Sequence, residues 1–249
     1  MDIFNALVDG MATLINWLYQ LSAAVGLPSY AVAIVLLTVL IKIILYPLTR
    51  AQMRSMIGLQ QLQPEIRKIQ EKYKDKQEQQ QKIMELYREK KVNPMAGCLP
   101  MLIQLPILIA LYRALYTFKY AVPAHAGLFW IPSLSHTDPL YILPVLAGIT
   151  TYIQSKLTMP KTAGGGQTGA ESTQKVMLIV MPLFIAWISI KLPAGLALYW
   201  VTFNVMGSIQ QYFINKQLVP AAAPAPTKEE VAEVAAEPGK QRKKRRGSR

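Results

Sequence analysis

The stretch VLLTVLIKIILYPLTR, residues 35–50, places a lysine, Lys42, inside a run that is otherwise apolar. From Tyr30 to Leu48, Lys42 is the only side chain that carries a charge at neutral pH. The run is close to the ~20 residues that a helix needs to cross ~30 Å of hydrocarbon. The sequence therefore predicts a membrane span at residues 28–48, whose lysine must be compensated by another group or used by the protein.

Further apolar runs follow along the chain. One covers residues 97–116 and contains Pro100 and Pro106, which a spanning helix tolerates when its neighbours pair the freed carbonyls. The next covers residues 139–157. The last is too long for one crossing and is broken by KLPAG at 191–195, so we interpret it as two helices, residues 176–190 and 194–213. With 52% hydrophobic residues among 249, the chain is predicted to be an all-α polytopic membrane protein with five transmembrane helices.

Two segments outside these runs have helical patterns of their own. Residues 1–27 carry an apolar stripe at alternating steps of three and four, formed by Phe4, Leu7, Met11, Leu14 and Leu18. This pattern predicts an amphipathic helix in the membrane interface. Residues 49–96 hold two apolar stripes, at 62–73 and 83–87, separated by the polar run KDKQEQQQ. They predict a cytoplasmic helical hairpin.

The lysines and arginines indicate the orientation. Residues 49–96 contain eleven of them, residues 156–175 three, and the chain after Phe213 nine, whereas the predicted loop 117–138 has Lys119 alone. Basic residues gather in the cytoplasmic loops of membrane proteins. We therefore expect the amino terminus outside, the loop 158–175 and the tail 214–249 in the cytoplasm, and a net charge of +13 that largely reflects this topology.

The tail ends in a basic cluster. Residues 221–238, rich in Pro, Ala and Glu, are predicted to be a disordered linker. The cluster that follows, KQRKKRRGSR, includes Arg242, Lys243, Lys244, Arg245 and Arg246. Such a cluster can bind phosphates of ribosomal RNA or anionic lipid headgroups, or simply reinforce the topology.

No motif in the sequence indicates an enzyme. A single cysteine, Cys98, excludes an internal disulfide, and no Cys/His spacing suggests a metal site. His125 and His136 fall in the predicted outer loop, where we expect both to be exposed. GGG at 164–166 lacks the context of a phosphate-binding loop. We therefore expect no catalytic residue, metal, cofactor or small-molecule substrate.

Three segments resemble the YidC/Oxa family of membrane protein insertases. NPMAGCLPMLIQLPILIALY at 93–112 resembles the second conserved span of that family, DPLYILPVLAGITTYIQSKL at 138–157 the third, and LPAGLALYW at 192–200 the fifth. The similarity covers about residues 28–216 in order, spacing and topology. The chain is similar to the short bacterial form, which implies a multi-pass protein of the bacterial cytoplasmic (inner) membrane.

The resemblance implies a five-helix core around a hydrophilic groove that is open to the cytoplasm and to lipid. An arginine of the family's first conserved span lies in that groove, and Lys42 stands at its position. Lysine keeps the charge but lacks the planar, multi-donor fork of arginine. The resemblance further implies that Gln154 and Trp200 line the groove and that Tyr199 lies near the substrate path, and we add Gln104 and Asn204 as polar residues of the spans.

Each of these residues has a simpler interpretation. Lys42 lies six residues before Leu48, about 9 Å along a helix, so its side chain could extend to the headgroups instead. Tyr199 and Trp200 could belong to an interfacial aromatic belt. Polar side chains between spans commonly serve only to hold helices together.

The expected function is insertion of membrane proteins. In this hypothesis, polar tails or loops of nascent membrane proteins cross through the groove and their apolar segments leave into lipid, alone or with the Sec translocon and the ribosome. The alternative is an ion or solute transporter that uses Lys42, for which no internal repeat or paired broken helix is evident. An intramembrane enzyme would need a catalytic dyad or metal ligands that the spans do not offer.

Overall fold

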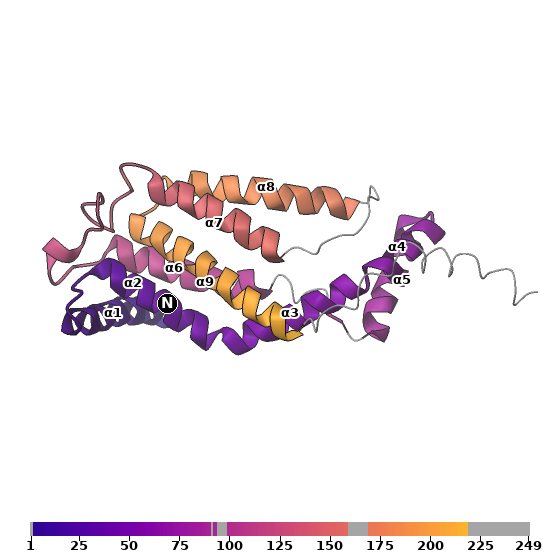
Figure 1. Cartoon of the computed structure of the whole chain (residues 1–249), viewed down its shortest axis with the longest axis horizontal. Helices are drawn as coiled ribbons and strands as arrows, with labels where there is room; N and C mark the ends of the chain where they lie inside the picture. Colours follow the sequence, from indigo (N-terminus) through magenta and orange to yellow (C-terminus); the bar gives the residue numbers. More distant parts are fainter. Residues whose placement is uncertain (1, 91, 94–98, 159–168, 219–249) are drawn as a thin grey trace, which may run out of the picture. The chain divides into compact units, whose positions relative to one another are not determined.

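The computed structural model of the chain describes residues 2–90, 92–93, 99–158 and 169–218. Figure 1 shows its helices, which are α1 (Asp2–Ala24), α2 (Tyr30–Ile44), α3 (Tyr46–Gln61), α4 (Gln63–Lys72), α5 (Lys76–Glu89), α6 (Leu99–Tyr116), the 3-10 helix η2 (Pro123–His125), α7 (Ile142–Thr158), α8 (Gly169–Ser189) and α9 (Ala194–Leu218). Within the described ranges, extended pairing is limited to one bridge between Leu128 and Ile131. The predicted all-helical class is confirmed.

The main apolar core is formed where α1, α2 and α6 pack together. Ile15, Ile34, Leu37 and Leu115 are fully buried there. Most of the predicted stripe of α1 faces this core: Met11 and Leu18 are buried, Phe4 and Leu14 pack against it, and only Leu7 is exposed, at 39%. The helix thus presents to α2 and α6 much of the apolar stripe that the sequence pattern predicted.

The junction of α1 and α2 is held by aromatic stacking. The rings of Tyr19 and Tyr30 are parallel, with centroids 4.1 Å apart. The Tyr30 hydroxyl donates to Asn16 at 3.3 Å and accepts the backbone N–H of Ala121 at 3.0 Å. His125 is half-buried and bonds through Nδ1 to the Tyr19 hydroxyl at 2.7 Å, so our expectation of an exposed histidine was wrong at this position.

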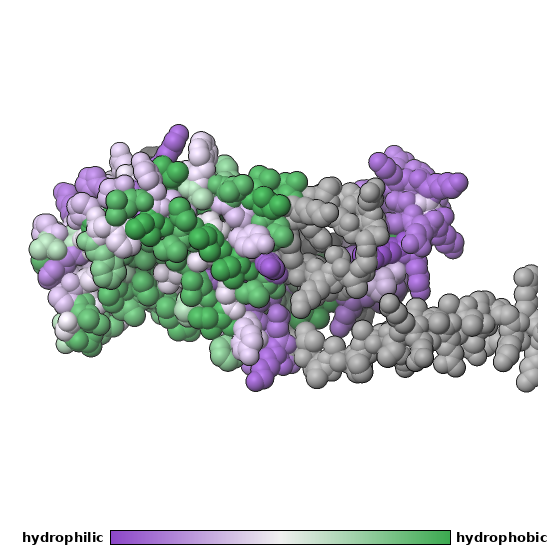
Figure 2. All heavy atoms as spheres, turned by 45° about the horizontal axis from the view of Figure 1, so that its top comes forward, coloured by the Kyte–Doolittle hydropathy of each residue, from purple (hydrophilic) through white to green (hydrophobic). Residues whose placement is uncertain are grey.

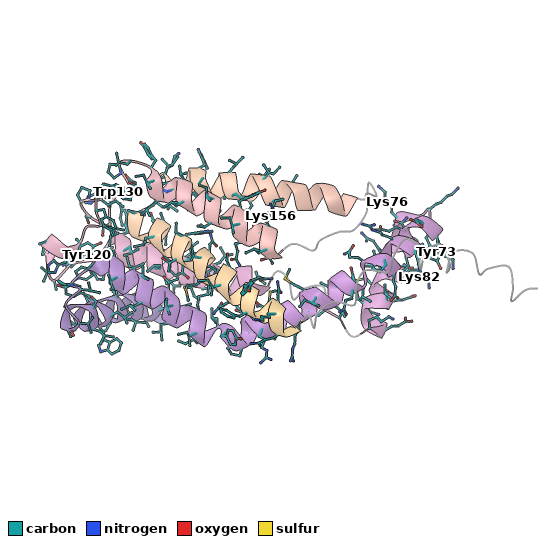
Figure 3. All side chains as sticks on the ribbon, viewed as in Figure 1. Tyr73, Lys76, Lys82, Tyr120, Trp130 and Lys156 are labelled. Carbon is teal, nitrogen blue, oxygen red and sulfur yellow. The ribbon has the colours of Figure 1, made fainter. Side chains whose placement is uncertain are left out.

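The connection between α6 and α7 is also well anchored (Figure 3, which labels Trp130 there). Asp138 is 2% exposed, and its carboxylate accepts the N–H groups of Leu140 and Leu143 at 3.0 and 2.7 Å. Trp130 donates its indole N–H to the same carboxylate at 2.8 Å. Because the orphan N–H groups at a helix start need acceptors, Asp138 fixes where α7 begins.

The same connection holds the start of α9. The N–H of Ala194 donates to the carbonyl of His136 at 2.7 Å, and that of Gly195 donates to Leu134 at 2.9 Å. A side chain at Gly195 would meet Ile34 and Leu115 at 3.0 and 3.1 Å. This close approach ties α9 to the core at one end.

Helices α7 and α8 form a tightly packed pair. A Cβ at Gly148 would lie 3.0 Å from the Cβ of Ala186 and 3.2 Å from the carbonyl oxygen of Pro182. Helix α8 begins at Gly169, within the segment predicted as the cytoplasmic loop 158–175, so it is longer than the predicted helix 176–190.

The segment α4–α5 forms a small hairpin. Leu62, Ile66 and Leu86, all from the predicted stripes, share one apolar cluster. Asp75 caps α5 by accepting the N–H of Gln77 at 3.1 Å. On the face shown in Figure 2, hydrophilic residues predominate over the α4–α5 segment, in contrast to the hydrophobic residues that gather over the middle of the other helices.

A helix that crosses a bilayer needs both sufficient length and an apolar composition. No single one of the described helices is both long and apolar enough to cross a membrane, whereas the pair Tyr30–Ile44 and Tyr46–Leu59, bent by 59°, satisfies these criteria together. The count of five crossings therefore stays a prediction.

Candidate functional site

Lys42 lies in the last turn of α2, close to where that helix ends. The N–H of Leu45 donates to the carbonyl of Ile41 at 2.9 Å, and α3 starts at the next residue. Pro47 has no N–H for the carbonyl of Ile43, so the helical ladder cannot continue through it. It lies instead in the first turn of α3, where no N–H is needed. The predicted span 28–48 is thus two helices, and Lys42 lies beside the bend.

The Lys42 side chain points into the protein. It is 6% exposed, and its Nζ lies 3.3 Å from the ring centroid of Phe203 on α9, a cation–π arrangement. Both ion pairs among the described residues belong to the α4–α5 segment, so no described carboxylate pairs with Lys42. Removing a charged lysine from water without an ion partner costs several kcal/mol. A carboxylate supplied from outside the described chain would therefore be strongly attracted here.

A ladder of polar side chains joins α7 and α9. Asn204 donates to the hydroxyl of Thr151 at 2.8 Å. One helical turn further, Ser208 donates to the side-chain oxygen of Gln154 at 2.8 Å. These residues recur every three or four positions on each helix, so they share one face. The facing sides of α7 and α9 are therefore polar, although both helices also carry many exposed apolar side chains.

Gly207 lets Lys42 and Gln154 meet at this ladder. A Cβ at Gly207 would lie 2.9 Å from Nζ of Lys42, 2.9 Å from Nε2 of Gln154 and 3.0 Å from its Oε1. The lysine of α2 and the glutamine of α7 thus approach the same point on the backbone of α9. Any side chain at position 207 would displace one of them.

Gln210 connects α9 to the end of α2. Its Nε2 donates to the backbone carbonyl of Lys42 at 3.1 Å, one of the carbonyls that lose their helical partner at the bend. Its Oε1 is buried and has no hydrogen-bond partner within the described part of the chain. Gln210 therefore holds the backbone of Lys42 while its own acceptor stays available.

Gln104 and Tyr199 form a second polar contact, between α6 and α9. Nε2 of Gln104 donates to the hydroxyl of Tyr199 at 2.7 Å, and Tyr199 is 1% exposed. The ring of Tyr199 lies 5.8 Å from that of Phe203, which covers Lys42. This pair is linked to the Lys42 site through Phe203.

The structure brings together some of the predicted site residues and not others. Lys42, Gln154 and Asn204 belong to one cluster, and Gln104 and Tyr199 adjoin it through Phe203. Trp200 is half-buried and makes no ring contact or hydrogen bond with another residue of the described ranges. The predicted tail contacts, Arg242, Lys243, Lys244, Arg245 and Arg246, lie outside the described residues.

Ser208, which bonds to Gln154, was not predicted, and neither were Phe203 and Gly207. A signal existed for Phe203 and Gly207, because both follow Tyr199 at steps of four residues and so lie along one face of α9. An apolar ring and a glycine within an apolar run carry no chemical mark of a site, however. Only the position of Lys42 shows what they do.

The cluster is suited to binding rather than to bond making. It combines one cation with amide and hydroxyl groups, and within residues 2–90, 92–93, 99–158 and 169–218 no group of three His, Cys, Asp or Glu side chains could hold a metal. A cation beside hydrogen-bonding groups in a buried setting can receive a carboxylate or a stretch of polar chain.

Comparisons with known proteins agree on the family. The sequence model described as "60Kd inner membrane protein" matches residues 20–221. The chain is 43% identical over 216 residues to "Membrane protein insertase YidC" of Fusobacterium nucleatum, covering 86% of this chain and 98% of that protein. It is 39% identical over 196 residues to the protein of the same name from Geobacter sulfurreducens, covering 78% of this chain and 35% of the relative.

A solved structure is also similar. "Active YidC insertase crystal structure with the first transmembrane domain resolved" superposes with a TM-score of 0.64 at 30% identity, covering 86% of this chain and 47% of that one. The chain therefore belongs to the 60Kd inner membrane protein (YidC/Oxa) family, and the resemblance seen in the sequence is confirmed. It spans about a third of the length of the Geobacter relative and nearly all of the Fusobacterium one.

The family assignment also indicates whether the chain is an enzyme. Its bacterial relatives are named as membrane protein insertases and not as enzymes, which agrees with the expectation that this chain is not an enzyme.

Proposed function

We propose that this protein is a membrane protein insertase of the bacterial inner membrane, which moves short polar tails or loops of nascent membrane proteins across the bilayer. The observation that carries the proposal is the buried Lys42, which has no carboxylate partner among the described residues and lies beside a polar face of α7 and α9. The names of its relatives support the same activity.

Acidic residues of the incoming tail are the partners that Lys42 lacks. In the absence of a substrate, the Phe203 ring is the group that faces the ammonium, at 3.3 Å. A cation–π contact contributes about 2 kcal/mol when it is desolvated. A carboxylate adds charge attraction and hydrogen bonds, so it displaces the ring. Gln154 and Asn204 then supply polar contacts that replace water along the path.

Transfer across the bilayer needs no nucleotide in this mechanism. A hydrophilic groove extending partway through the bilayer shortens the dry path for the polar tail. A membrane potential, negative inside, favours outward movement of each acidic charge by ~2.3 kcal/mol per 100 mV. The apolar segment of the substrate leaves along the exposed apolar side chains of α7 and α9, among them Ile149, Ile153 and Ile209. Its burial in lipid drives release.

The proposed topology follows the distribution of basic residues. Five crossings place the amino terminus outside and the hairpin α4–α5, the 158–175 loop and the tail in the cytoplasm. There, the basic cluster 242–246 would contact ribosomal RNA or anionic lipid, and the protein would act alone or beside the Sec translocon.

The test is insertion of a single-span substrate with an acidic amino-terminal tail into proteoliposomes that contain the purified protein. Wild type is compared with Lys42→Arg, Lys42→Met and the matched control Lys156→Gln, which removes an exposed lysine from the last turn of α7 (labelled in Figure 3). Each is also given the same substrate with its tail acids changed to amides.

We expect Lys42→Met to reduce insertion of the acidic tail at least about tenfold, because truncating one partner of a close charge pair costs about 2–5 kcal/mol. Lys42→Arg and Lys156→Gln should retain it, and the amide tail should insert equally with all variants. Equal insertion of the acidic tail by Lys42→Met would reject the role of Lys42. Absence of insertion by the wild type, with lysine-dependent uptake of a solute, would favour a transporter.

A further inference from the structure

A cavity of about 310 Å³ between α1 and α6 lies apart from the Lys42 cluster and shares no residue with it. It is lined by Asn5, Val8, Tyr112, Arg113, Tyr116 and Thr117. The proposed function makes no use of these residues, and their chemistry is that of a binding site.

Arg113 is the charged group of this cavity. It lies in the last turn of α6, and its side chain is exposed. Its guanidinium carbon lies 5.1 Å from the ring centroid of Phe4, a contact that orients the planar group. Neither ion pair of the described residues includes Arg113. Arg113 is thus a lining residue whose guanidinium, with its five N–H donors, has no anionic partner among the described residues.

The other walls are apolar and aromatic with polar tips. The rings of Tyr112 and Tyr116 lie 5.9 Å apart, and the two residues are 36% and 70% exposed. Their hydroxyls have no hydrogen-bond partner among the described residues, and the same holds for the Asn5 side chain. Val8 adds an apolar surface and packs partly against the main core. A ligand that fits both features has an anionic head beside an apolar portion.

We propose that this cavity binds the phosphodiester headgroup of a membrane phospholipid, with Arg113 as the anion-binding residue. A guanidinium binds phosphate through two parallel N–H···O bonds, which a compact ammonium cannot do. Arg113 lies one turn from the end of α6, so its long side chain can reach the level of the headgroups. Tyrosines are enriched at that level of a membrane, and the acyl chains would continue along Val8 and the tyrosine rings.

The test measures lipid retained by the full chain in detergent micelles, by native mass spectrometry during titration with phosphatidylglycerol. Wild type is compared with Arg113→Gln, Arg113→Lys and Lys119→Gln, the last being an exposed cation six residues away that does not line the cavity. Val8→Trp keeps Arg113 but fills the space. If Arg113→Gln does not fold, lipid retention by Val8→Trp still shows whether the lipid occupies the cavity.

We expect retained phosphatidylglycerol to fall at least about fivefold in Arg113→Gln and in Val8→Trp, to fall less in Arg113→Lys, and to be unchanged in Lys119→Gln. Inorganic phosphate alone should compete weakly, because it makes no contact with the apolar walls. Unchanged retention in Arg113→Gln or Val8→Trp would overturn the site, since the lipid would then be a nonspecific annular one. Full displacement by inorganic phosphate would overturn the lipid as its ligand.

Discussion

The two halves of α2 lie in different surroundings. In the first half, Ile34 and Leu37 are fully buried in the apolar core shared with α1 and α6. In the second half, Lys42 is buried beside Phe203 and the polar ladder of α7 and α9. Lys42 is nearly as buried as Ile34 and Leu37, but only the two apolar side chains prefer to leave water. Packing of the first half therefore stabilises the fold, and this stabilisation offsets the free-energy cost of burying the charge of Lys42 in the second half.

The two buried glycines of α9 show the same division. A side chain at Gly195 would meet Ile34, Leu115 and the carbonyl oxygen of Leu134 at 3.0–3.2 Å, all within the packed core. A side chain at Gly207 would meet the ends of Lys42 and Gln154, which can rotate away. The same substitution should therefore affect stability at one position and function at the other.

The largest effect on stability is expected for Leu115→Ala. The side chain is fully buried in the apolar core, so its removal should lower the free energy of unfolding by about 2–5 kcal/mol. Thermal unfolding of the purified protein in detergent measures this loss, with Leu102→Ala on the same helix, where the side chain is 59% exposed, as the control. The ratio of acidic-tail to amide-tail insertion should not change. A change in that ratio would contradict the separation between an apolar core that stabilises the fold and a Lys42 site that receives the substrate.

The matched pair Gly195→Ala and Gly207→Ala should give the next largest effect. We expect Gly195→Ala to cost about 1–3 kcal/mol, because overpacking a tight core forces its neighbours to shift. Gly207→Ala should change the unfolding temperature little but reduce acidic-tail insertion, because it displaces Lys42 or Gln154. Equal destabilisation by both substitutions, with insertion unaffected, would remove the distinction between the two regions.

A smaller effect is expected for Tyr30→Phe, which keeps the stacked ring and removes the hydroxyl bonds to Asn16 and Ala121. A net hydrogen bond contributes about 1 kcal/mol. The free energy of unfolding should fall by about that amount, while Tyr212→Phe, a 65% exposed tyrosine on α9, should have no effect. A loss near that of Leu115→Ala would show that the aromatic junction, rather than the apolar core, dominates stability.

The smallest effect is expected for Asn204→Leu in the polar ladder. Hydrogen bonds between helices in a membrane contribute about 0.6 kcal/mol on average. The bond to Thr151 is short, at 2.8 Å, but its loss should still lower the free energy of unfolding by under about 1 kcal/mol. A loss above about 2 kcal/mol would mean that the ladder is structural in the same sense as the core.

The all-helical class and several polar residues of the site could be predicted from the sequence. Apolar runs of membrane length, broken at KLPAG, predict helices without any tertiary information. Lys42 and Asn204 stood out because each is polar within an apolar run, whereas Gln154 was selected through the family resemblance, and the structure brings the three together. A polar residue in such a setting has few faces on which it can be accommodated.

The other residues of the site could not be predicted, because their positions depend on how each helix is rotated about its axis. An apolar run does not indicate that rotation. Tyr199 and Trp200 are adjacent, so they point about 100° apart, and only Tyr199 is joined to the cluster. Phe203 and Gly207 belong to the site only because the side chain of Lys42 lies against them in the folded protein. The bend after Ile44 could have been anticipated from Pro47, since an apolar segment that contains proline need not be one helix.

A charge exchange between Lys42 and the substrate tail would show whether Lys42 contacts acidic residues of the substrate. Insertion into proteoliposomes would be measured for wild type and Lys42→Glu without an imposed membrane potential. Each protein would be given a substrate with an acidic tail and the same substrate with lysines in place of the acids. A third substrate with an uncharged tail would show that Lys42→Glu is folded. We expect Lys42→Glu to lose insertion of the acidic tail and to gain insertion of the basic tail, with a coupling of at least about tenfold between the two charge changes. If both proteins insert the three tails in the same order of efficiency, Lys42 does not contact the substrate and the proposed mechanism is wrong.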